Sequence, residues 1–139
     1  MSAGLLYRIS SVLLVLFAIG HTLGFRQTKG MEGADTVVGL MKSARFHVQG
    51  FERNYYDFYV GFGLFVTVFL LFAAALTWQL GGLSPEALSR IPIVATWGLA
   101  VCFVAITAMT WRYFFMVPDI FSTVITACLI AAAWAGGRS

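Results

Sequence analysis

Four long stretches of the chain are almost wholly apolar, and most polar residues lie between them. The stretches cover residues 5–25, 55–80, 92–115 and 118–136. A helix needs about 20 apolar residues to cross a hydrocarbon layer roughly 30 Å thick. The pattern therefore predicts four membrane-spanning helices in a single integral membrane domain over residues 1–139.

The links between these stretches predict how the helices are arranged. Two links are short, and one, residues 26–54, is long and polar. Short links join neighbouring helices that run in opposite directions. The predicted fold class is therefore all-α: a four-transmembrane-helix up-down-up-down bundle with a polar loop between the first and second helices.

The long link contains a segment with helical periodicity. Over residues 34–46 several apolar side chains fall near one side of a helix. These positions are Val37, Leu40, Met41 and Phe46. The pattern predicts an amphipathic helix that lies on the membrane surface.

The link between the second and third stretches carries signals for the end of one helix and the start of another. Gly81 and Gly82 favour termination of the second span. Ser84, Pro85 and Glu86 provide an N-cap, a first-turn proline and an acid that the helix dipole favours. We expect a short helix to begin at this point.

Composition supports a membrane location and excludes a soluble domain. Of the 139 residues, 60% are hydrophobic and only 11% are charged, and the mean hydropathy is +0.85. Soluble domains contain roughly 45–50% apolar residues. The formal charge is +3, but the basic residues are scattered singly, so we expect no nucleic-acid partner.

The distribution of basic residues predicts the orientation in the membrane. We call the side of the bundle that carries residues 26–54 the loop face. Six basic residues belong to it, Arg26, Lys29, Lys42, Arg45, Arg53 and Arg112, against three on the opposite side, Arg8, Arg90 and Arg138. Because basic residues favour the cytoplasmic side, we expect the loop face to be cytoplasmic.

Alternation of chain direction brings polar side chains from distant parts of the sequence to similar depth at the loop face. The candidate ligand-binding residues are His21, Glu52, Tyr56, Asp57, Tyr59, Trp111, Arg112 and Asp119. Ionisable groups inside a membrane are costly, so they usually face the bundle interior, pair with one another and mark functional sites. We therefore predict a ligand site at the loop face.

Two of these residues have more than one interpretation. Arg112 is an interfacial anchor between its aromatic neighbours, an ion-pair partner of Asp57 or Asp119, or a direct ligand contact. His21 lies between Gly20 and Gly24, a small-xxx-small pair that favours close helix approach. Its imidazole is expected to bond a carboxylate or tyrosine, to handle a proton, or to bind haem or a metal.

No cofactor is predicted. Haem b is worth testing, since helix bundles hold haem between axial ligands on facing helices. The only other histidine, His47, lies in the polar loop, and the chain has no Cys-x-x-Cys-His or His-x-x-His motif. The sequence therefore predicts neither haem nor a metal site.

Small and polar residues form stripes on the last two spans. The third span shows Gly98, Cys102, Ala105, Met109 and Arg112, and the fourth shows Asp119, Thr123, Thr126 and Ala133. Such stripes indicate helix–helix contact, with threonine hydroxyls bonded to their own helix. The alternative is that they line a narrow, apolar cleft open to the loop face.

Part of the chain resembles a family of small four-span bacterial membrane proteins. The similar residues are 46–64, with Gly20-His21-Thr22 before them and Trp111-Arg112-Tyr113-Phe114 after them. The resemblance implies the four-span architecture and the bacterial inner membrane, and it brings no activity with it.

In size and span number the chain is also similar to DoxX-like membrane proteins and to the microsomal glutathione transferase superfamily. Glu52 and Arg53 stand where that superfamily has an acidic–arginine pair at the start of its second helix. The further arginine and asparagine of its pattern are not matched. Glutathione binding is therefore not transferred.

Two classes of function follow from these observations. The first is a binding module that holds an apolar or lipid-like ligand in a cleft at one membrane face, or an accessory subunit that packs against other membrane proteins or copies of itself. The second is a membrane-embedded enzyme that acts on a lipid-like or quinone-like substrate. In that enzyme His21 and either Asp57 or Glu52 would be acid and base, and Arg112 would hold an anionic or carbonyl group.

Overall fold

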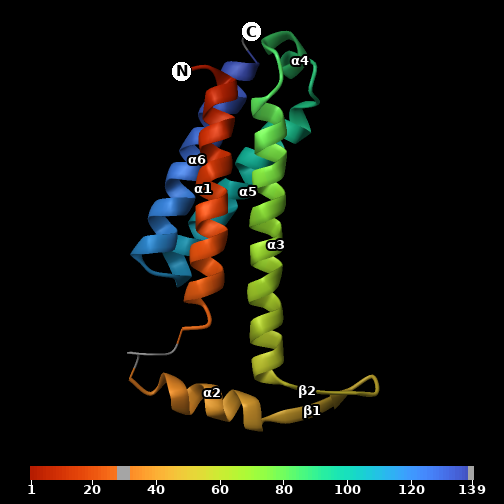
Figure 1. Ribbon diagram of the computed structural model, residues 1–139, viewed down its shortest axis with the longest axis vertical. Coiled ribbons are helices and arrows are strands. Elements are labelled where there is room, and N and C mark those ends of the chain that lie inside the picture. The colour runs from red at the N-terminus through yellow and green to blue at the C-terminus, as the bar shows by residue number, and fades with distance from the viewer. Residues whose placement is uncertain (28–31, 138–139) are drawn as a thin grey trace. The chain divides into compact units, whose positions relative to one another are not determined.

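The computed structural model describes residues 1–27 and 32–137, so Lys29 and Arg138 of the charge count lie outside the described residues (Figure 1). Four of its helices are long and apolar enough to cross a membrane. They are α1 (Ala3–Gly24), α3 (Tyr55–Gly81), α5 (Ile93–Tyr113) and α6 (Met116–Gly136). The four long apolar helices predicted from the sequence are confirmed, and they indicate an integral membrane protein of the all-α class.

The shorter elements connect these helices. They are α2 (Ala34–Ser43), β1 (Arg45–Val48), β2 (Phe51–Asn54) and α4 (Pro85–Ser89). Helix α2 ends three residues earlier than the predicted amphipathic segment. Phe46 therefore belongs to a strand and not to the helix.

The two strands form a hairpin that the sequence analysis did not predict. Val48 pairs with Phe51, so Gln49 and Gly50 make the turn. Both have positive φ, 51° and 85°. This is the backbone of a type I′ turn, whose twist matches that of the strands it joins.

Local capping explains where two helices begin. At the start of α3, Asn54 Oδ1 accepts the Asp57 N–H at 2.9 Å, and Asp57 Oδ2 accepts the Asn54 N–H at 3.2 Å. At the start of α4, Ser84 Oγ accepts the Ala87 N–H at 3.2 Å, as expected of an N-cap. Hydrogen bonds from the Glu86 backbone and from Ser84 lower the pKa of the Glu86 carboxyl.

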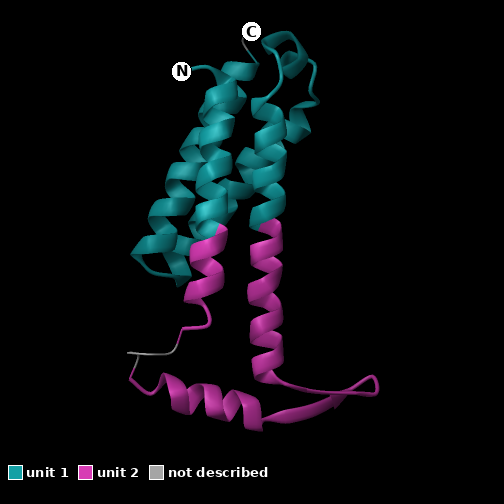
Figure 2. Cartoon of the chain, viewed as in Figure 1, with its two compact units in different colours: residues 1–17, 70–139 teal, residues 18–69 magenta. Residues whose placement is uncertain are grey.

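The chain divides into two compact units (Figure 2). Unit 1 contains residues 1–17 and 70–139, and unit 2 contains residues 18–69. Helices α1 and α3 each contribute one part to each unit. The single domain expected from the sequence stays a prediction.

Unit 1 is a helical bundle in which successive long segments alternate in direction, as predicted (Figure 1). Its largest fully buried side chains include Tyr7, Leu14, Leu70, Phe103, Ile125 and Leu129. The first part of α1 and the last part of α3 approach closely at Gly4 and Gly81. A Cβ atom on Gly81 would lie 2.9 Å from the Gly4 carbonyl oxygen.

Two predictions about helix contacts need correction. On α5 the buried positions are Leu99, Ala100, Phe103 and Thr110, so the predicted contact stripe through Cys102 and Met109 is wrong. Both of those residues are exposed. The large side chain of Phe103 and the hydroxyl of Thr110 contribute more to the packing of α5 than the small residues of the stripe do.

The glycines beside His21 were also misinterpreted. A Cβ atom on Gly20 or Gly24 would meet nothing within 4 Å. Among the described glycines of unit 2, Gly63 is tightly packed, because a Cβ atom there would lie 2.7 Å from the Phe25 ring. An isolated glycine pair does not reveal which side of a helix faces its neighbour.

Candidate functional site

The eight predicted site residues fall in two groups. His21, Glu52, Tyr56, Asp57 and Tyr59 belong to unit 2, and Trp111, Arg112 and Asp119 belong to unit 1. A single cluster of all eight stays a prediction. The contacts within each unit show what each side chain does there.

In unit 2, His21 joins α1 to α3 through the backbone. Its Nε2 lies 3.0 Å from the Gly63 carbonyl oxygen. A carbonyl oxygen can only accept, so Nε2 carries the hydrogen and donates it. Thr22 Oγ1 and Thr67 Oγ1, at 2.8 Å, add a second polar link between the same helices. The partner of the imidazole is thus neither the carboxylate nor the tyrosine expected from the sequence.

Two tyrosines add contacts nearer the start of α3. Tyr59 donates its hydroxyl to the Phe25 carbonyl oxygen at 2.6 Å. The Tyr56 and Tyr59 ring centroids lie 6.2 Å apart. The Lys42 ammonium lies 4.7 Å from the centre of the Tyr56 ring, within range of a cation–π interaction. The tyrosines therefore fix the end of α1 and the end of α2 to α3.

The two carboxylates of unit 2 that were predicted as site residues, Glu52 and Asp57, have structural partners. Glu52 Oε1 accepts a hydrogen bond from Arg45 Nη1 at 2.7 Å. This bond and the charge of Glu52 raise the pKa of the Arg45 guanidinium. Asp57 caps α3, as described above. Each carboxylate has a role in holding the backbone of unit 2.

In unit 1 a ladder of hydroxyl groups joins α5 to α6. Thr107 Oγ1 lies 2.8 Å from Thr126 Oγ1, and Thr110 Oγ1 lies 2.8 Å from Ser122 Oγ. Thr126 also donates to the Phe103 carbonyl oxygen of α5 at 3.0 Å. The threonine and serine hydroxyls therefore bond across the two helices as well as within each helix, and they provide the polar part of this contact.

Asp119 lies in the first turn of α6, at one end of the ladder. Its residue exposure is 9%, and its backbone carbonyl oxygen accepts hydrogen bonds from Ser122 and Thr123. Its side-chain Oδ1 is buried and has no hydrogen-bond partner among the described residues. A buried acceptor without a partner is unfavourable, which makes this atom a candidate for contact with a ligand.

Arg112 and Trp111 behave as residues of a membrane interface. The Arg112 guanidinium lies 5.2 Å from the centre of the Tyr113 ring, and within unit 1 it forms no ion pair with Asp119 among the described residues. Trp111 Nε1 donates to Thr123 Oγ1 at 3.0 Å. These contacts favour the anchor interpretation of Arg112.

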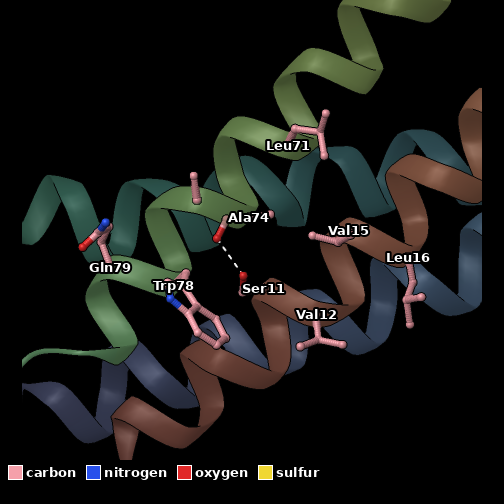
Figure 3. A pocket seen from close by; sticks show the side chains of 9 residues that line it. Ser11, Val12, Val15, Leu16, Leu71, Ala74, Trp78 and Gln79 are labelled. Carbon is pink, nitrogen blue, oxygen red and sulfur yellow. Dashed lines mark hydrogen bonds between the residues drawn. The ribbon is translucent and has the colours of Figure 1, made fainter.

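A groove that the sequence analysis missed lies between α1 and α3 in unit 1 (Figure 3). Its volume is about 510 Å³. The lining residues are Ser11, Val12, Val15, Leu16, Leu71, Ala74, Ala75, Trp78 and Gln79. Ser11 Oγ donates to the Ala74 carbonyl oxygen at 2.8 Å and joins the two walls. None of the predicted site residues lines this groove.

A basic side chain lies at one end of the groove. The Arg8 guanidinium carbon lies 4.7 Å from the centre of the Trp78 ring, and Arg8 Nε donates to the Gly81 carbonyl oxygen at 3.2 Å. Arg8 also lines a second hollow, of about 580 Å³, with Gly4, Gly81 and Leu88. The groove is therefore apolar along its length and cationic at one end.

Small residues in the sequence are a signal from which this groove could have been predicted. Ser11 on α1 and the pair Ala74 and Ala75 on α3 leave room between two otherwise bulky helix surfaces. Arg8 entered the sequence analysis only through the charge count, and Trp78 did not enter it. Hydropathy does not show that the helix carrying Arg8 packs against the helix carrying Trp78.

The comparisons with known proteins do not identify this chain. No family model, no curated protein and no solved structure matches it. The resemblance to small four-span bacterial proteins therefore rests on the quoted residues alone, and the similarity to DoxX-like proteins rests on size and span number alone. Over residues 1–27 and 32–137, no three His, Cys, Asp or Glu side chains form a group that could hold a metal ion, and the expected lack of haem stays a prediction.

Proposed function

We propose that the protein binds a lipid-like ligand in the groove between α1 and α3 of unit 1. The observation that carries the proposal is the groove itself, about 510 Å³ and lined mainly by apolar side chains of two membrane-spanning helices. Ligand pockets typically measure about 300–1,000 Å³ and are mostly apolar with a few polar groups. This function keeps the predicted ligand class but uses a different place in the bundle.

The chemistry of the groove suggests an acyl chain with an anionic headgroup. Val12, Val15, Leu16 and Leu71 provide an apolar wall that suits a hydrocarbon chain. Arg8 is exposed at the end of the groove, where a long basic side chain reaches toward the headgroup layer. A guanidinium also binds phosphate and carboxylate oxygens in bidentate geometry.

We further propose that the protein resides in the bacterial inner membrane with residues 26–54 in the cytoplasm. The basis is the predicted excess of basic residues on the loop face and the resemblance described above. Function as an accessory subunit is the alternative that the native mass spectrometry experiment distinguishes.

Native mass spectrometry of the detergent-purified protein tests ligand binding. Ala75 lines the groove, whereas Ala131 is an exposed alanine on α6 that does not. Ala75→Phe is expected to fill the groove and to reduce lipid adducts several-fold. The matched variant Ala131→Phe is expected to keep them. Arg8→Gln is expected to reduce adducts of anionic lipids more than those of zwitterionic lipids.

Equal lipid adducts in the wild type and in Ala75→Phe would contradict the groove proposal. An absence of adducts in the wild type, combined with co-purification of a partner subunit, would favour the accessory-subunit function instead.

Membrane-embedded catalysis is a second candidate because Asp119 Oδ1 is buried and lacks a partner among the described residues. A carboxyl group in that state can exchange a proton with a bound substrate. Comparison of lipid and quinone pools between host cells that express the wild type and Asp119→Asn tests this candidate. Unchanged pools would contradict it.

A further inference from the structure

We infer that the β1–β2 hairpin lies flat in the phospholipid headgroup layer of the membrane that the four long helices cross. Phe46, Val48 and Phe51 face the hydrocarbon in this arrangement, and Arg45, His47 and Glu52 face water. The inference concerns unit 2 alone and does not depend on the groove in unit 1.

The register of the hairpin separates apolar from polar side chains. Phe46 pairs with Arg53 and Val48 with Phe51, so these four side chains share one face. The other face carries Arg45, His47, Glu52 and Asn54. The Arg45–Glu52 ion pair lies on this second face, and both side chains are largely exposed. One face is thus mainly apolar, and the other is charged.

Ring contacts show which face is turned toward the hydrocarbon. The Phe46 ring centroid lies 5.3 Å from that of Tyr55 and 5.4 Å from that of Phe58, both on α3. The apolar face therefore lies on the side from which α3 extends into the membrane. Phe46 continues an aromatic stripe along α3, because Phe58 lies 6.3 Å from Phe62, and Phe62 lies 6.5 Å from Phe65.

The stripe is exposed, and a lipid environment accounts for this exposure. Phe58, Phe62 and Phe65 have exposed fractions of 46%, 64% and 73%. These rings belong to a membrane-spanning helix, so acyl chains cover them. The hairpin face is continuous with this lipid-facing surface through Phe46, and the same membrane is the occupant that fits Val48 and Phe51.

The position of the hairpin along α3 fits the headgroup layer. Gly63 lies at the level of His21, near the end of α1, because the two are hydrogen-bonded. Tyr55 begins α3 eight residues earlier, about 12 Å further along the axis at 1.5 Å per residue. Helix α3 has 27 residues and is therefore about 40 Å long. This length matches the thickness of the hydrocarbon core plus the headgroup regions. The hairpin therefore lies beyond the hydrocarbon core.

Arg53 provides a phosphate-binding guanidinium on the apolar face of the hairpin. Its guanidinium lies 5.2 Å from the centre of the Phe51 ring, and its Nη1 donates to the Glu52 carbonyl oxygen at 2.7 Å. Over residues 1–27 and 32–137 the other guanidinium donors of Arg53 have no hydrogen-bond partner, so they can bind lipid phosphate oxygens. An arginine stacked on an aromatic ring is a typical arrangement of a membrane interface.

Spin labels on neighbouring residues of opposite faces test this placement. Val48→Cys and His47→Cys are made with Cys102 and Cys128 changed to alanine, and each variant is labelled and reconstituted in phosphatidylcholine vesicles. Phe65→Cys provides the hydrocarbon standard. The ratio of collision rates with oxygen and with a water-soluble nickel chelate is measured by electron paramagnetic resonance.

The label at Val48→Cys is expected to show an oxygen-to-nickel ratio several-fold higher than the label at His47→Cys, and lower than that at Phe65→Cys. Equal access of nickel to both hairpin labels would place the hairpin in water and overturn the inference. Protection of Val48→Cys from both reagents would show a protein partner or second copy on this face, which would also overturn it. Circular dichroism of each labelled variant confirms that its helices are intact.

Discussion

At the scale of single residues, Asp119 differs from the other candidate carboxylates in its hydrogen bonding. Its Oδ1 atom is buried without a partner among the described residues, whereas the carboxylates of Glu52 and Asp57 have partners. An unsatisfied buried polar atom costs about 1–3 kcal/mol. The sequence singled out all three residues as ionisable groups near a membrane face. It could not separate them, because pairing depends on contacts between side chains.

We predict that Asp119→Asn leaves the free energy of unfolding unchanged or raises it by up to about 3 kcal/mol, because the variant removes the charge and keeps the shape. Helical content followed during denaturation in mixed detergent measures this. Asp57→Ala is the comparison and should lose about 1 kcal/mol, because it removes the hydrogen bond from the Asn54 N–H to Asp57 Oδ2. Destabilisation by Asp119→Asn would mean that the carboxylate has a partner in the purified protein.

At the scale of elements, hydropathy predicted the long helices well because each apolar stretch is close to a membrane thickness. Helix α3 was expected over residues 55–80 and extends to Gly81. The hairpin was missed because each strand has four residues, too few for alternation to stand out. The Asn54–Asp57 capping box was present in the sequence but was not used, because Asp57 was interpreted as a site residue.

Helix packing predicts opposite effects for two glycines of α3. Gly81→Ala should destabilise the protein by about 1–3 kcal/mol, because the new methyl group would lie 2.9 Å from the Gly4 carbonyl oxygen. Gly61→Ala meets nothing within 4 Å and should stabilise α3 by about 0.5–1 kcal/mol through helix propensity. Thermal unfolding in detergent, followed by circular dichroism, compares the two. Equal effects would contradict the close α1–α3 contact in unit 1.

At the scale of the whole molecule, the orientation in the membrane stays a prediction from the charge count. We expect Gln49→Cys, in the hairpin turn, to react with a membrane-impermeant maleimide only after permeabilisation of bacterial cells. Ser84→Cys, before α4, should react in intact cells. Both variants need Cys102 and Cys128 replaced by alanine. The reverse pattern of labelling would place residues 26–54 outside the cytoplasm.

Unequal helix lengths have a consequence for the lipid around the protein. Helix α3 has 27 residues, while α5 and α6 have 21 each, which corresponds to about 40 Å against about 31 Å. Helices α5 and α6 therefore match the hydrocarbon core, about 30 Å thick, whereas α3 also extends through the headgroup region. A bilayer with a thicker hydrocarbon core would cover more of α3 than of the two shorter helices, so the stability of the protein should depend on acyl-chain length.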